Sequence, residues 1–142
     1  MKTIAVLLTV HNRKDKTLSC LENVFGQSMP EGFCTDVWLV DDGCTDGTAE
    51  AISERFPQVH VLKGDGNLYW NRGMILAWQS AAESKVYDYY LWLNDDSNIY
   101  GYCLKTLLET SAVYADKTIV VGSTYDTVSR STLTYGGRNA AE

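Results

Sequence analysis

The chain has 142 residues, of which 45% are hydrophobic and 21% charged, the balance of one ordinary globular domain. Its formal net charge is -6, which argues against nucleic acid and anionic membrane surfaces as partners, because both attract basic proteins. An anionic substrate would need a divalent cation or a helix N-terminus to bind to so acidic a chain.

Apolar runs alternate with helical patterns from the N-terminus onward. Continuous apolar stretches predict buried strands at residues 4–10, 37–40, 59–62, 89–93 and 119–121. Between them, apolar residues at helical spacing predict helices around residues 18–25, 49–56, 71–84 and 104–112. A polar, β-prone stretch at 129–135 and a turn at Gly136-Gly137 follow.

This alternation predicts an α/β fold, a three-layer α/β/α domain over residues 1–142 with a mostly parallel sheet and helices on both faces. In open sheets of this kind, ligands bind beyond the carboxyl ends of the strands. Polar clusters follow four of the predicted strands, at residues 9–12, 41–48, 63–67 and 94–96. We therefore expect these clusters to form one binding site.

The sequence favours a cytoplasmic location. The apolar stretch 4–10 is far too short to cross a membrane, and no small-residue cleavage site of a signal peptide follows it. The four cysteines have neither CxxC spacing nor nearby histidines, so the sequence does not indicate a zinc or redox motif. Free thiols in a reducing cytosol are the favoured interpretation.

The cluster Asn94-Asp95-Asp96 directly follows an apolar strand. Adjacent carboxylates repel each other, and a divalent cation relieves that repulsion. Mg²⁺ and Mn²⁺ prefer one or two carboxylates together with substrate phosphates. The competing interpretation is that Asp96 or Ser97 caps a helix that begins near Tyr100, which is locally the commoner use of such residues.

The segment 41–48 contains three carboxylates and two glycines, more than a plain turn needs, although a tight turn with Asp46 as helix N-cap would use several of them. A carboxylate here could accept hydrogen bonds from a base or from ribose hydroxyls, as in dinucleotide folds. The glycine-rich loop 63–67 could hold a phosphate on its backbone N–H groups, or be a simple turn. Arg72 could neutralise a diphosphate.

Taken together, these clusters resemble those of family 2 glycosyltransferases of the GT-A fold, in particular the rhamnosyltransferase-like members. The matching stretches are residues 6–13, 38–48, 64–70 and 91–97, in an order and spacing that match over roughly residues 3–125. A Val-Asp-Asp-Gly-x-Thr-Asp-Gly-Thr stretch with a downstream Asn-Asp-Asp is fairly specific, whereas either piece alone is not. Asn94 stands at the first position of the family's DxD motif.

The resemblance implies that the chain binds a nucleoside diphosphate sugar, with Mn²⁺ or Mg²⁺ bridging the diphosphate. It implies base contacts from Thr9 and Asp42, a ribose or sugar contact from Asp95, and a metal bond from Asp96. The full set of implied donor-binding residues is Thr9, Val10, Asn12, Asp41, Asp42, Gly64, Gly66, Asn67, Arg72 and Asp95.

The resemblance also implies transfer of the sugar to a hydroxyl group of a glycan or lipid-linked acceptor, with inversion at the anomeric carbon, in polysaccharide or cell-surface glycan synthesis. Family members are much longer, so we expect a chain truncated before the acceptor-binding half, with the catalytic general base outside it. A full-length protein of this kind is expected to associate peripherally with the inner face of a membrane. Where the family has Ala-Arg-Asn, this chain has Trp70-Asn71-Arg72-Gly73.

Alternatives from other classes remain open. A sugar nucleotidyltransferase would need a glycine- and lysine-rich loop after the first strand, where His11-Asn12-Arg13-Lys14 contains no glycine. A domain that binds a nucleotide without catalysis is the second alternative, and it suits a truncated chain. A phosphoacceptor receiver domain is weaker, because Asp41-Asp42 follow the second predicted strand and not the first.

Overall fold

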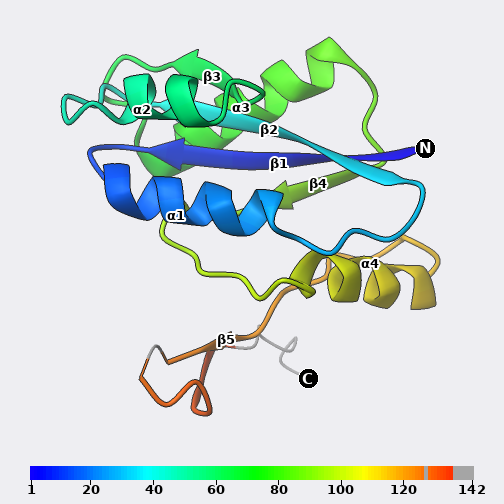
Figure 1. The fold of residues 1–142 in the computed structure, drawn as a ribbon. Coiled ribbons are helices and arrows are strands. Elements are labelled where there is room, and N and C mark those ends of the chain that lie inside the picture. Colours follow the sequence, from blue (N-terminus) through cyan, green and yellow to red (C-terminus); the bar gives the residue numbers. More distant parts are fainter. Residues whose placement is uncertain (127, 136–142) are drawn as a thin grey trace, which may run out of the picture.

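The centre of the structure, a computed structural model that describes residues 1–126 and 128–135, is a four-stranded parallel sheet (Figure 1). Its strands lie in the order β3-β2-β1-β4, with the bounds β1 (Lys2–Val10), β2 (Phe33–Asp41), β3 (His60–Lys63) and β4 (Tyr89–Trp92). The strands predicted at residues 4–10, 37–40, 59–62 and 89–93 are therefore confirmed. The register places Val10 beside Asp41 and Leu7 beside Trp92, which brings the carboxyl ends of the strands to one edge of the sheet.

Helices cover both faces of the sheet, as the alternating pattern predicts. Their bounds are α1 (Lys14–Phe25), α2 (Thr48–Arg55), α3 (Tyr69–Ser84) and α4 (Cys103–Val113). Alternate residues of β1 and β2 point to opposite faces, and one set packs against Leu21 of α1 and Ile52 of α2. The other set packs against Met74 and Ala77 of α3. The continuous apolar run of β1 is thus explained by burial on both faces.

Gln27 attaches the segment around α4 to the end of α1. Its side-chain oxygen accepts a hydrogen bond from the backbone N–H of Leu104 (3.0 Å), and its amide donates to the carbonyl of Tyr100 (2.9 Å). Leu104 is buried, and Leu108 packs at the border of the core that α1 covers. α4 therefore lies on the α1 side of the sheet (Figure 1).

The fifth predicted strand, at residues 119–121, is wrong. Ile119 is 95% exposed and lies in neither sheet. An apolar run of this length forms a strand only beside another strand edge, and within residues 1–126 and 128–135 no strand pairs with the outer edge of β4. Instead, β5 (Thr124–Tyr125) and β6 (Leu133–Tyr135) form a small antiparallel sheet apart from the main one (Figure 1).

The strand predicted at 129–135 is therefore confirmed only in its last three residues. The predicted turn at Gly136-Gly137 lies outside the described residues. As for membrane spans, none of the helices in the described part of the chain combines the length and the hydropathy that crossing a bilayer requires.

Candidate functional site

The polar clusters that follow the strands meet around the carboxyl end of β1. Since β1 lies between β2 and β4, Asp41 and Asp42 stand on one side of that end and Asp95 and Asp96 on the other. The chain runs from β1 outward to β2 and β3, and returns to the opposite side of β1 with β4. Such a change of direction opens a crevice where ligands bind in sheets of this type.

Asp42 is buried, with 4% of its surface exposed, and among the described residues its side-chain oxygens accept hydrogen bonds from three backbone N–H groups. One oxygen accepts a hydrogen bond from Gly66 (2.8 Å), and the other accepts from Leu68 and Tyr69 (3.0 Å each). Hydrogen bonds to a charged acceptor are about twice as strong as neutral ones. The predicted contact of Asp42 with a base stays a prediction, while the structure shows this carboxylate bound to the loop before α3.

The glycine-rich loop packs directly on the Asp42-Gly43 turn. Gly43 and Gly66 both have positive φ angles, and a Cβ on Gly43 would lie 2.9 Å from the Cα of Gly66. The N–H of Gly64 donates to the carbonyl of Asp41 (2.8 Å), and the N–H of Asn67 donates to Asp65 (2.8 Å). The N–H groups of Gly64, Gly66 and Asn67 are thus bound within the protein, while the predicted contact of this loop with a phosphate stays a prediction.

Asn12 ties the end of β1 to the turn after β2. It adopts a left-handed conformation (φ 51°), which asparagine tolerates better than most residues. Its side-chain oxygen accepts a hydrogen bond from the N–H of Thr45 (2.7 Å). Asp41 accepts from the N–H of Cys44 in the same turn (2.8 Å). Asn12 and Asp41 therefore fix the turn after β2 beside the end of β1.

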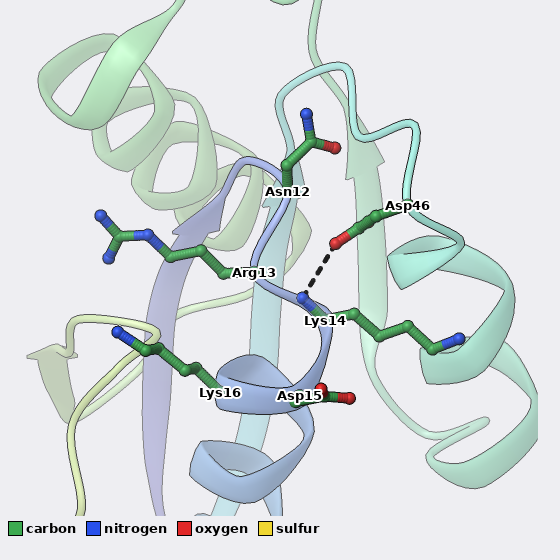
Figure 2. A pocket seen from close by; sticks show the side chains of 6 residues that line it. All are labelled: Asn12, Arg13, Lys14, Asp15, Lys16 and Asp46. Atoms are coloured by element: carbon green, nitrogen blue, oxygen red, sulfur yellow. Dashed lines mark hydrogen bonds between the residues drawn. The ribbon is translucent and has the colours of Figure 1, made fainter.

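Asp46 joins the first turns of α1 and α2. The sequence predicts it as an N-cap, but the structure places Gly47 at that position, with φ 79°. Asp46 stands one residue earlier, where it accepts hydrogen bonds from the hydroxyl and the N–H of Thr48 and from the N–H of Lys14 (3.0 Å). Figure 2 shows the contact with Lys14. These bonds, led by that of the Thr48 hydroxyl, lower the pKa of Asp46.

An Asp46→Asn variant should lose stability mainly near neutral pH. The pKa of Asp46 is lower in the folded than in the unfolded state. Its charge therefore stabilises the fold at pH values above about 4, the ordinary pKa of an aspartate. That contribution disappears as the pH falls through the lowered pKa. Urea denaturation from pH 7 to pH 3 should show the free energy of unfolding of the variant approaching that of the parent. A difference that stays constant over this range would contradict the assignment.

Asp95 and Asp96 share one guanidinium, that of Arg13. Its Nη1 lies 3.0 Å from Asp96 and 3.4 Å from Asp95. Asp95 also accepts a hydrogen bond from the Thr17 hydroxyl (3.3 Å). Burial raises the pKa of Asp95, the Arg13 charge opposes this, and the Asp96 carboxylate adds to it. The interpretation of Asp96 or Ser97 as a helix cap is wrong, because α4 begins only at Cys103, its N-cap position is Tyr102, and no side chain caps it.

These two carboxylates fit a divalent cation only in part. No group of three or more His, Cys, Asp and Glu side chains in the described residues is arranged to hold a metal ion. Asp95 is buried, whereas Asp96 is 39% exposed at its side chain and can face a ligand. One or two carboxylates are what Mg²⁺ takes when substrate phosphates supply the remaining ligands. The donor set suits a metal shared with a diphosphate.

Arg13 is a site residue that the sequence predictions missed. With Lys14 and Lys16 it lines an open hollow of about 670 Å³ at the start of α1, which Asn12, Asp15 and Asp46 complete. Figure 2 shows Arg13 and Lys16 extending to one side of the loop and Lys14 to the other. The signal for it was present in three basic residues close together after the first strand. Their contact with Asp95 and Asp96, 82 and 83 residues away, was not readable from the sequence.

The remaining predicted residues occupy different places. Thr9 is 9% exposed and lies under α3, where a Cβ on Gly73 would come within 2.2 Å of its hydroxyl. Val10 is buried in the core. Arg72 is exposed in the first turn of α3. Among the described residues, its side chain forms no hydrogen bond and no ion pair. Trp70, by contrast, donates from its indole to the side-chain oxygen of Asn94 (2.9 Å).

All four cysteines are free. Burial raises the pKa of Cys20 to about 12, and the nearby Asp95 adds to this. Burial also raises the pKa of Cys44 to about 11. Both thiols therefore stay protonated at neutral pH, which makes them poor nucleophiles and poor metal ligands.

Comparison with known proteins gives a consistent picture. The profile of the family described as "Glycosyl transferase family 2" matches residues 5–139. Among curated proteins no match was found. Residues 1–349 of TarS from S. aureus in complex with UDP share the fold, with a TM-score of 0.61 and 18% identity over 81% of this chain and 33% of that chain. The complex of TarS with UDP-GlcNAc gives a TM-score of 0.61 and 18% identity over 82% of this chain and 32% of that one.

A third similar structure is the mannosyltransferase PcManGT from Pyrobaculum calidifontis in complex with GDP-Man and Mn²⁺. It gives a TM-score of 0.50 and 21% identity over 66% of this chain and 27% of that chain. The chain thus spans about a third of the length of the solved structures that it matches, and less in this last case. At these identities the likeness shows the α/β fold with a mostly parallel sheet.

Proposed function

Because the chain belongs to glycosyl transferase family 2, we propose that it is the donor-binding part of an enzyme that moves a sugar from a nucleoside diphosphate sugar to a hydroxyl acceptor. The observation that supports this most is the convergence of Asp41-Asp42, Asp95-Asp96 and Arg13 around the end of β1. TarS has been solved with UDP and with UDP-GlcNAc, and the mannosyltransferase with GDP-Man and Mn²⁺. Membership in the family also weighs against the sugar nucleotidyltransferase alternative.

The metal ligand in this proposal is Asp96, with Asp95 beside it. Mn²⁺ or Mg²⁺ would supply positive charge for the leaving diphosphate. Arg13, which contacts both carboxylates, would be available to pair with the diphosphate if a cation neutralised those carboxylates. An always-charged guanidinium matches phosphate oxygens well. The acidic chain would thus meet the charge of the donor with a metal and one arginine.

The acceptor side of the proposal is coarser. In-line attack by the acceptor hydroxyl would invert the anomeric carbon, and a carboxylate base would take the hydroxyl proton. No residue of this chain is assigned as that base. The cytoplasmic location, the glycan or lipid-linked acceptor and the association with a membrane face stay predictions.

Calorimetric titration of the chain with UDP, dTDP and GDP, each with and without Mn²⁺, tests the proposal. We expect at least one diphosphate to bind, and to bind more tightly with Mn²⁺, because Asp96 and the diphosphate would both supply oxygen ligands to the metal. The matching nucleoside monophosphates are the control, since they cannot form the same bridge and should gain less from Mn²⁺. Absence of binding by all three diphosphates under both conditions would contradict the donor-binding role.

A further inference from the structure

We infer that Arg13 is a stand-in cation for Asp95 and Asp96, and that it makes the binding of a metal ion and the binding of a diphosphate depend on each other. While no metal is bound, its guanidinium neutralises part of the carboxylate charge. A divalent cation has to compete with it, and the displaced guanidinium gains a new partner only when an anion is present. The inference rests on the proposed function, because it needs a metal and a diphosphate at one site.

A single nitrogen of Arg13 serves both carboxylates. Its Nη1 lies 3.0 Å from Oδ2 of Asp96 and 3.4 Å from Oδ1 of Asp95. Two negative carboxylates and one positive guanidinium leave one net negative charge after β4, and a negative group repels a diphosphate. A divalent cation would make the same group positive by one charge. The metal-free site therefore disfavours the anion that the metal-bound site attracts.

Arg13 and a metal ion compete for the same carboxylate. Asp96 is 39% exposed at its side chain and lines a second hollow, of about 360 Å³, with Ser19 and Asn98. A cation from solvent can reach it there. Positive charges that share one carboxylate repel each other, so a cation that binds Asp96 weakens or breaks its ion pair with Arg13. A metal without an anion thus binds at the cost of that ion pair.

The structure lets Arg13 change partners while its backbone stays in place. Its carbonyl accepts a hydrogen bond from the N–H of Thr17 in the first turn of α1 (2.9 Å), and the N–H of the next residue, Lys14, donates to Asp46 (3.0 Å). The side chain is 49% exposed, and Figure 2 shows it extending away from the loop along one side of the hollow. The guanidinium can therefore exchange one anion for another without a change in the fold.

Coupling follows because one guanidinium serves either the carboxylates or the diphosphate. It has a partner when no ligand is bound and when the diphosphate is bound alone, but the metal alone takes its partner away. With both ligands bound, it pairs with the diphosphate. The doubly occupied state is thus favoured over metal binding alone, and each ligand raises the affinity of the other by the same factor.

Titration with Mn²⁺ alone, followed by the electron paramagnetic resonance signal of the free ion, tests the competition. Arg13→Gln should bind Mn²⁺ about 3- to 10-fold more tightly than the parent, because two partly exposed ion pairs together are worth about this factor and no longer have to be broken. An unchanged or weaker affinity, or no Mn²⁺ binding by either protein, would overturn the inference.

The matched control is Lys16→Gln. Lys16 lines both hollows and extends to the same side as Arg13 (Figure 2), but among the described residues it forms no ion pair. The variant removes the same charge and should change the Mn²⁺ affinity much less, because charges that are not in contact are screened by salt. An equal gain in both variants would mean a general charge effect and would contradict a specific role of Arg13.

Calorimetric titrations with UDP, dTDP and GDP, with and without Mn²⁺, test the coupling. For the diphosphate that the parent binds best, the factor by which Mn²⁺ raises its affinity should fall about 3- to 10-fold in Arg13→Gln. The same factor should stay unchanged in Lys16→Gln. Arg13 lies outside the core with a half-exposed side chain, so urea denaturation should show both variants folded and close to the parent in stability.

These measurements distinguish failure of the inference from failure of the proposed function. If the parent binds no diphosphate under either condition, the proposed function fails, while the Mn²⁺ titrations still decide whether Arg13 competes for the carboxylates. If Mn²⁺ strengthens diphosphate binding by the same factor in the parent and in Arg13→Gln, the donor site stands and the role of Arg13 is wrong.

Discussion

Replacement of Asp96 by alanine should abolish the gain in nucleoside diphosphate affinity that Mn²⁺ provides. Asp96 is the more exposed of the two acidic residues at the end of β4, and in the proposed function its carboxylate would leave Arg13 and bind the cation. Even indirect support of a metal site is typically worth about 10- to 100-fold in metal affinity, so loss of a direct ligand should cost about 100-fold or more. Calorimetry with and without Mn²⁺ measures the effect.

Two features make this a clean experiment. The ion pair between Asp96 and Arg13 is partly exposed on both sides, so its loss should change the free energy of unfolding by less than about 1 kcal/mol. Glu54→Ala removes the same charge from an exposed position in α2 and is the control. If Mn²⁺ strengthens binding equally in the parent and in Asp96→Ala, Asp96 is not the metal ligand.

Replacement of Gly73 by alanine should destabilise the fold, although alanine is the better helix former by about 1 kcal/mol. Gly73 lies inside α3, where a Cβ would stand 2.2 Å from the hydroxyl and 2.8 Å from the Cβ of Thr9. Overpacking of this kind typically costs about 1–3 kcal/mol. Urea denaturation of the two proteins measures the loss.

The neighbour of Gly73 offers a direct check. In a double variant with Thr9→Ala, the hydroxyl and methyl groups that the new Cβ meets are gone, so part of the lost stability should return. Gly101→Ala is the control, because a Cβ there would find its closest neighbour at 3.9 Å, an ordinary contact. A Gly73→Ala variant as stable as the parent would show that α3 can move away from β1 at little cost.

The elements of the parallel sheet were predictable because their signals are local. The apolar run 4–10 is long enough to indicate a strand buried on both faces, and the helical spacing of Leu18 and Leu21 indicates the face that packs on it. The run 119–121 carries the same local signal but forms no strand. Whether such a run is paired depends on a neighbouring strand edge, and that is a property of distant residues.

The same division applies to the proposed donor site, on which the two carboxylate clusters converge. The residue types and their places after the strands indicate an acidic, phosphate-facing site, because parallel strands end at one edge. The order of the strands, with β1 between β2 and β4, decides that the clusters face each other across that end. Arg13 joins Asp95 and Asp96 only through this arrangement.

Asp42 illustrates the limit most clearly. From the sequence it is one of two neighbouring carboxylates with the same expected role, since nothing local distinguishes it from Asp41. The fold buries Asp42 under the loop before α3 and binds it to three amides, 24 to 27 residues further along the chain. Residue chemistry and spacing were sufficient to place a carboxylate at the site. Which groups satisfy that carboxylate was decided by packing between distant segments, because a buried charge takes the partners that the fold brings within hydrogen-bonding distance.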